Sequence, residues 1–153
     1  MPGTFVIDAS VVVEFLIPRE LSGPVDRFIR ALTWSQPIAL VAPDLLFLEV
    51  PSALARLARR HDLTSREADQ AVSRLLRLPI GPVPASGLVE EGWKLRKNVT
   101  IYDASYLALA RGLEVPLVTA DRRLAKAARS ARIRAWAVDD RELETLLDSL
   151  ETA

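Results

Sequence analysis

The chain has 153 residues, of which half are hydrophobic and about a quarter charged, a balance typical of globular proteins. Cysteine is absent and histidine occurs once, as His61, which excludes disulfides, thiolate zinc sites, cysteine nucleophiles and ribonuclease chemistry by paired imidazoles. The formal net charge is zero, so any phosphate-binding surface must be local. No apolar run approaches the roughly 20 residues that cross a bilayer, and no signal-peptide pattern opens the chain, so we expect a cytoplasmic protein without a membrane partner.

The first elements alternate between strand and helix. Residues 5–7 form a short apolar, β-prone run, which predicts a buried strand that ends at Asp8. A helix is expected from about Ser10 to Pro18 and a second over about 23–34. Another short buried strand is predicted at 39–42.

Two helices are predicted next. The first begins at Asp44 as N-cap, continues to about residue 60 and is kinked at Pro51, which removes one backbone donor. A capping box at residues 64–67 begins the second, which should end near Leu78.

The remaining segments continue the alternation. Residues 79–84 are rich in proline and glycine, which predicts a loop or an edge strand. Helices are expected over 86–97 and over 102–111, the latter closed by Gly112. A strand is predicted at 117–119 and is followed by Asp121.

The C-terminal segment has an uneven charge distribution. Its six basic residues between 122 and 134 have no acid among them, which predicts a basic helix. A strand follows at 135–138. The final helix is predicted to begin with a capping box formed by Asp139 and Glu142.

Short apolar strands alternating with helices predict a parallel sheet covered by helices on both faces, in one domain over residues 1–153. Asp8 and Asp121 each follow the carboxyl end of such a strand, and this is the edge where open α/β sheets bind ligands. We therefore expect the two aspartates to lie at a common site.

The acids have both structural and functional interpretations. Asp8, Asp103 and Asp121 stand near helix starts, where aspartate is a favoured cap. Glu49 differs, because its neighbours at helical spacing are apolar and no basic residue lies within a turn of it. Clustered carboxylates suit Mg²⁺ or Mn²⁺, which prefer hard oxygen ligands and can activate water beside a phosphate. The four acids thus predict a metal-binding pocket that cleaves phosphodiester bonds.

Four segments resemble the successive signature blocks of the PIN-domain family, and most closely its VapC-type toxins. The blocks are VIDAS at 6–10, LEV at 48–50, TIYDASYLALA at 100–110 and LVTADRRL at 117–124. Each brings one acid, and the resemblance extends from residue 5 to about 138. It implies a three-layer α/β/α fold with a five-stranded, mostly parallel sheet in the order 3-2-1-4-5.

The resemblance also implies a function. It points to a Mg²⁺- or Mn²⁺-dependent endoribonuclease, the toxin of a type II toxin–antitoxin system, with a VapB-type antitoxin as inhibitor and a homodimeric toxin. By position, the family's acidic residues are Asp8, Glu49, Asp103 and Asp121. Ser10 and Thr119 match its small polar residues, with Thr119 expected to orient a carboxylate or a water.

Two departures from the family pattern affect the metal site. Pro51 follows Glu49 closely, which leaves open whether Glu49 is a direct ligand. No further acid follows Asp121, so the number of metal ions stays open. Beside the pocket, Arg122 and Lys126 share a face of the basic helix and are candidate contacts for RNA phosphates.

The sequence leaves two alternatives open. One is a housekeeping RNA-processing PIN nuclease, although the lack of an appended domain favours the toxin. The other is a non-catalytic PIN-like binding module, although the presence of all four acids argues against a decayed site. The sequence carries no base-reading motif that would name the RNA.

Overall fold

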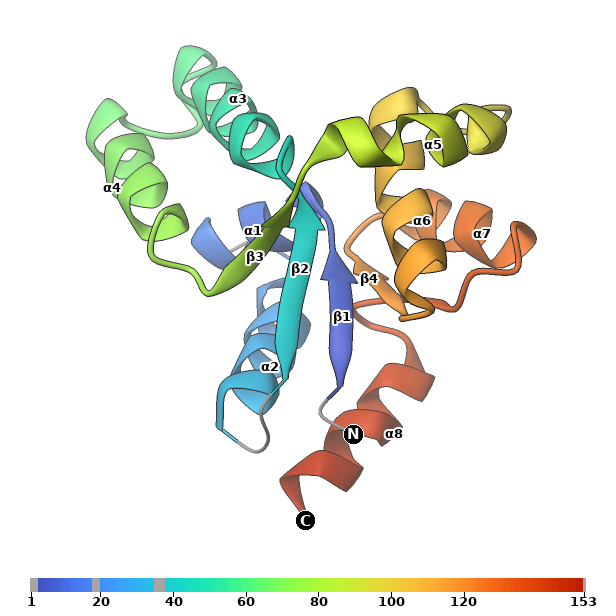
Figure 1. Cartoon of the computed structure of the whole chain (residues 1–153). Coiled ribbons are helices and arrows are strands. Elements are labelled where there is room, and N and C mark those ends of the chain that lie inside the picture. Colours follow the sequence, from blue (N-terminus) through green and yellow to red (C-terminus); the bar gives the residue numbers. More distant parts are fainter. Residues whose placement is uncertain (1–2, 18–19, 35–37, 153) are drawn as a thin grey trace.

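The computed structural model describes residues 3–17, 20–34 and 38–152 of the chain. Within these residues five strands form one sheet: β1 Thr4–Ile7, β2 Ala39–Pro43, β3 Ile80–Val83, β4 Leu117–Thr119 and β5 Ala135–Ala137. Every neighbouring pair is parallel, and the spatial order is β3-β2-β1-β4-β5 (Figure 1). The predicted strand order is confirmed.

Helices cover this sheet on both sides (Figure 1). Their bounds are α1 Ala9–Leu16, α2 Ser22–Trp34, α3 Leu46–Arg59, α4 Ser65–Leu75, α5 Val89–Leu95, α6 Ile101–Leu113, α7 Arg122–Ser130 and α8 Arg141–Glu151, with a 3₁₀ turn at Ala85–Leu88. Among the residues described, no helix has the length and apolar character needed to cross a membrane.

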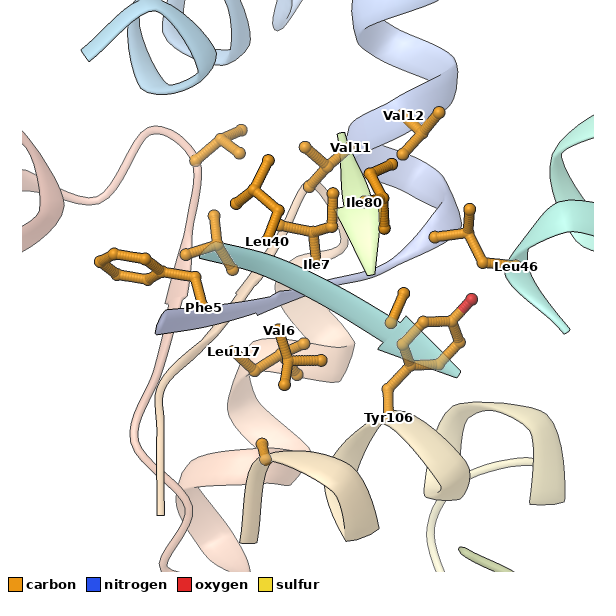
Figure 2. Packing of buried hydrophobic residues seen from close by; sticks show 14 of the residues in the cluster. Phe5, Val6, Ile7, Val11, Val12, Leu40, Leu46, Ile80, Tyr106 and Leu117 are labelled. Carbon is orange, nitrogen blue, oxygen red and sulfur yellow. The ribbon is translucent and has the colours of Figure 1, made fainter. Parts of the chain in front are cut away.

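The hydrophobic core lies on both faces of the sheet, because successive side chains along β1 point to opposite faces. Successive strand residues point to opposite faces of a sheet, so neighbours in β1 enter different halves of the core. Figure 2 shows Ile7 on the side of Val11 and α1, whereas Val6 and Leu117 face α6. The side chains of all four are fully buried. Because the sheet is apolar on both faces, its strands read as continuous hydrophobic runs in the sequence.

Two predicted helix starts are wrong, for the same reason. Helix α3 begins at Leu46 without a side-chain cap, because Asp44 accepts instead from the backbone N–H of Ala85 at 3.0 Å. The last helix is preceded by Asp140 rather than Asp139, and Glu142 accepts from the indole N–H of Trp136. In both cases a distant partner takes the oxygen that a local cap would have used.

Other predicted elements are present, with smaller differences at their boundaries. Residues 80–83 do form an edge strand, and α3 continues through Pro51 to Arg59. Helix α6 passes Gly112 and ends at Leu113, and its C-cap residue Glu114 adopts a left-handed backbone conformation with φ of 55°. Pro18, where the first helix was expected to end, lies outside the described residues.

Candidate active site

The candidate site lies where the strand order reverses. β1 is flanked by β2 on one side and β4 on the other, so the connections after β1 and β4 leave the sheet in different directions. Such a switch point at the carboxyl edge is where open α/β sheets bind ligands. Asp8 follows β1 directly, and Asp121 follows β4 after one intervening residue.

Asp8 is held from three directions at this point. The side chain is only 6% exposed and caps α1 by accepting from the backbone N–H of Val11 at 3.3 Å. The Ser10 hydroxyl donates to its Oδ1 at 2.6 Å, and the Thr119 hydroxyl donates to its Oδ2 at 2.7 Å. The cap interpretation of Asp8 is therefore correct, but it accounts for only part of the surroundings of this carboxylate.

The same two hydroxyls also tie down the chain after β4. Ser10 Oγ accepts from the backbone N–H of Ala120 at 2.9 Å, and Thr119 Oγ1 accepts from that of Asp121 at 2.9 Å. Each hydroxyl donates to Asp8 while it accepts from the β4–α7 connection. Ser10 and Thr119 thus link the position of Asp8 to that of Asp121.

Asp121 and Asp103 reach the site from helix starts in different ways. Asp121 is exposed and caps α7, its Oδ1 accepting from the backbone N–H groups of Arg123 at 2.9 Å and Leu124 at 3.4 Å. Asp103 does not cap α6, because Thr100 fills that position and accepts from the Asp103 N–H at 3.1 Å. The half-buried Asp103 carboxylate therefore does not serve as the cap of this helix.

Glu49 comes from α3 and has a partner that the sequence interpretation missed. The hydroxyl of Tyr106 donates to its Oε1 at 2.7 Å. Tyr106 stands on α6 three residues after Asp103, which places the two on one helix face. That spacing, together with the hydroxyl at an otherwise apolar position, was the available signal for Tyr106.

Asp103 lies within electrostatic range of each of the other three acids. The pKa of Asp8 is raised to about 6, mainly by burial and to a smaller extent by the nearby charge of Asp103, while its hydrogen bonds act in the opposite direction. Burial also raises the pKa of Glu49, and the nearby charge of Asp103 acts in the same direction. The pKa of Asp103 is raised by burial and then by Asp121. Each of these charge effects involves Asp103, which therefore links Asp8, Glu49 and Asp121 electrostatically.

This donor set fits a hard divalent cation. Carboxylates that are buried and mutually repelling need a positive partner, and among the described residues none of the four acids forms an ion pair. Within the same described residues, no group of three or more acidic or histidine side chains is arranged so that it could hold a metal ion. Mg²⁺ does not need such a group, because it keeps several waters and takes one or two carboxylates directly.

The predicted phosphate contacts differ from each other in the structure. Arg122 is ion-paired with Asp139 at 2.6 Å and stands 3.9 Å from Asp140. Lys126 is exposed on the same helix and forms no ion pair within the described part of the chain. Arg122 therefore ties α7 to the segment before α8, whereas Lys126 keeps its charge available.

Comparison with known proteins identifies similar chains. A family model described as the PIN domain matches residues 5–130. Ribonuclease VapC1 of Mycobacterium tuberculosis is 41% identical over 123 residues, which cover 80% of this chain and 89% of that protein.

Solved structures share the fold at lower identity. PAE2754 from Pyrobaculum aerophilum superposes with a TM-score of 0.61 at 23% identity, over the full length of both chains. VapBC2 from Rickettsia felis, solved bound to a DNA fragment from its promoter, gives a TM-score of 0.59 at 10% identity and covers 88% of this chain and 98% of that one.

Proposed function

The chain belongs to the PIN-domain family, among its VapC-type ribonucleases, and from that premise we propose that it is the toxin of a type II toxin–antitoxin pair and cleaves RNA with the help of Mg²⁺ or Mn²⁺. The observation that carries the cation dependence is the setting of Asp8. This buried carboxylate stands among further acids at the switch point of the sheet, with a pKa of about 6. An arrangement that repels its own charges is useful only when a cation occupies it.

The residues that would hold the cation are Asp8 and Asp103 first, then Asp121 and Glu49. A bound divalent ion supplies an activated water and neutralises charge that develops on the phosphoryl oxygens. Glu49 and Asp121 each keep one carboxylate oxygen out of the protein hydrogen bonds described above, so that oxygen is open to the ion or to one of its waters.

The other polar groups prepare this site. Ser10 and Thr119 direct the oxygens of Asp8 and prevent its carboxylate from turning. Since both hydroxyls are also fixed by backbone N–H groups, the geometry is set before substrate arrives. Lys126 supplies the exposed positive charge for an RNA phosphate beside the acids.

The proposed partners follow from the family. A VapB-type antitoxin would inhibit the toxin, and the toxin would act as a homodimer in the cytoplasm, where its RNA substrate is. The complex of Rickettsia felis, which has the same fold, supports an antitoxin partner. The 153 residues would act as one catalytic domain, since the described core residues form a single hydrophobic cluster.

The test is sequencing of RNA 5′ ends after brief expression of wild-type protein and of the Asp8→Asn variant. Wild-type protein should create new 5′ ends at defined sites and arrest growth, whereas the variant should do neither. The matched in vitro assay adds Mg²⁺ or Mn²⁺ to purified protein and follows cleavage with and without chelator. Full metal-dependent cleavage by both Asp8→Asn and Asp103→Asn would overturn the proposal.

A further inference from the structure

Tyr106 is among the most deeply buried side chains of the protein, yet it carries a hydroxyl to the candidate site. It is 1% exposed and stands in the middle of α6, which packs on β1, β2 and β4. Figure 2 shows its ring projecting from α6 with the hydroxyl oxygen on the side of Leu46 in α3. Because the ring is enclosed by the core, the position of that oxygen is fixed by packing.

The hydroxyl meets a side chain from a different layer of the fold. Its partner, Glu49 Oε1, lies 2.7 Å away and 57 residues earlier in the chain. Glu49 itself is half-buried in the first turn of α3, next to Leu48, which is 77% exposed. A glutamate at such a border has a solvent-facing alternative, and its three side-chain torsions cost little to change.

The local helix gives Glu49 little support of its own. Helix α3 lacks a side-chain cap at Leu45, and Pro51 has no N–H to bond the carbonyl of Phe47. The carboxylate also lies within range of the charge of Asp103, which repels it. The Tyr106 hydroxyl is thus the contact that opposes withdrawal of Glu49 towards solvent.

We propose that Tyr106 is a positioning residue, which holds one oxygen of Glu49 so that the other is presented to the cation bound by Asp8 and Asp103. The inference rests on the proposed function. A tyrosine hydroxyl suits this task because it has one proton to donate, and the hydrogen bond leaves the second carboxylate oxygen open. Groups that orient a metal-binding side chain in this way typically change metal affinity or activity by roughly 10- to 100-fold when removed.

The test is calorimetric titration of the full chain with Mn²⁺, comparing wild type with Tyr106→Phe. The variant removes one oxygen atom and keeps the packed ring. We expect Mn²⁺ affinity about 10-fold weaker and RNA cleavage reduced by a similar factor, with an almost unchanged KM for RNA. Tyr102→Phe is the matched control, because Tyr102 is the only other tyrosine, lies on the same helix and is 61% exposed.

A double-mutant cycle separates positioning from simple structural support. If Tyr106 acts through Glu49, Tyr106→Phe should cost Mn²⁺ affinity in wild type and nothing further in Glu49→Gln protein. Equal losses in both backgrounds would overturn the inference, as would wild-type affinity in Tyr106→Phe. Wild-type protein that binds no Mn²⁺ would overturn the proposed function as well, so the two failures are distinguishable.

A spectroscopic measurement covers the case in which Tyr106→Phe folds poorly. In Tyr102→Phe protein the single remaining tyrosine is Tyr106, and ultraviolet resonance Raman bands of tyrosine report the hydrogen bonding of its hydroxyl. Adding Mg²⁺ should shift these bands, because the cation draws charge from the carboxylate that accepts the bond. Bands that stay unchanged at Mg²⁺ saturation would contradict the assignment.

Discussion

The hydroxyl of Thr119 donates to Asp8 Oδ2 at 2.7 Å, although the two residues are 111 positions apart. Thr119 is fully buried at the end of β4, and Asp8 follows the neighbouring strand β1. The same hydroxyl oxygen accepts from the backbone N–H of Asp121. One small side chain therefore sets the distance between two of the candidate cation ligands.

Replacing Thr119 tests this bridge. Thr119→Val keeps the β-branched shape but leaves the Asp121 N–H without its acceptor and Asp8 without one donor. We expect RNA cleavage to fall at least 10-fold and the free energy of unfolding to fall by about 1–3 kcal/mol. Thr119→Ser, which restores the hydroxyl, should recover most of the activity. A valine variant as active as wild type would show that the bridge is dispensable.

The raised pKa of Asp8 predicts how the stability of the metal-free protein depends on pH. Between its ordinary pKa of 3.8 and about 6, folded protein holds a proton that the unfolded chain has released. The stability from this proton is complete below about pH 4 and is lost as the pH rises through 6, by about 3 kcal/mol for a shift of this size. Burial shifts Glu49 and Asp103 in the same direction.

Urea unfolding of metal-free protein between about pH 4 and pH 8 measures this dependence. Asp8→Asn keeps the side-chain oxygen that caps α1 but cannot ionise. Its curve should be flatter, and at neutral pH the variant should be more stable than wild type. A pH dependence identical to that of wild type would mean that Asp8 titrates normally.

Divalent cations should restore the stability that the metal-free protein loses as the pH rises. Near neutral pH, Mg²⁺ at 100 times its dissociation constant should add about 2.7 kcal/mol to the free energy of unfolding, and chelator should remove it. At about pH 4 the effect should nearly vanish, because protonated carboxylates do not bind the ion. Monovalent salt at equal ionic strength is the control, and an equal gain from that salt would identify screening rather than binding.

The sequence predicted the sheet, and the positions of Asp8 and Asp121 at one edge of it, because both depend on short segments. A buried strand followed by an acid can be recognised in two of the four signature blocks, those of Asp8 and Asp121, and parallel strands bring these two acids to one edge. Glu49 and Asp103 stand on helices instead. Partner choice could not be predicted in the same way. Asp44 has the sequence setting of a helix cap, yet its side-chain oxygen accepts a hydrogen bond from the backbone N–H of Ala85, 41 residues away.

Glu49 illustrates the same limit within the site. Its apolar surroundings on α3 correctly indicated that it needs a partner. In the proposed function that partner is a cation, but one carboxylate oxygen of Glu49 already accepts a hydrogen bond from Tyr106. Only the packing of α6 against the sheet brings that hydroxyl into reach, and no pattern within α3 encodes it.

Arg122 and Lys126 allow a last prediction, because their similar positions on α7 have different electrostatic surroundings. Arg122 is paired with Asp139, while Lys126 is unpaired among the described residues. Lys126→Ala should weaken RNA binding and lower the slope of log affinity against log salt by roughly 0.7, the value for one phosphate of a single strand. Binding by fluorescence anisotropy across salt concentrations measures both.

Arg122→Ala should change that slope less and reduce the free energy of unfolding by at most about 1 kcal/mol, as for other largely exposed ion pairs. Its pairing with Asp139 already neutralises the charge that a phosphate would otherwise meet. Arg66→Ala controls for net charge, since Arg66 is exposed on α4, at the opposite side of the molecule from α7 in Figure 1. If Arg122→Ala lowers the slope as much as Lys126→Ala does, the ion pair opens when RNA binds, and both cations contact phosphate.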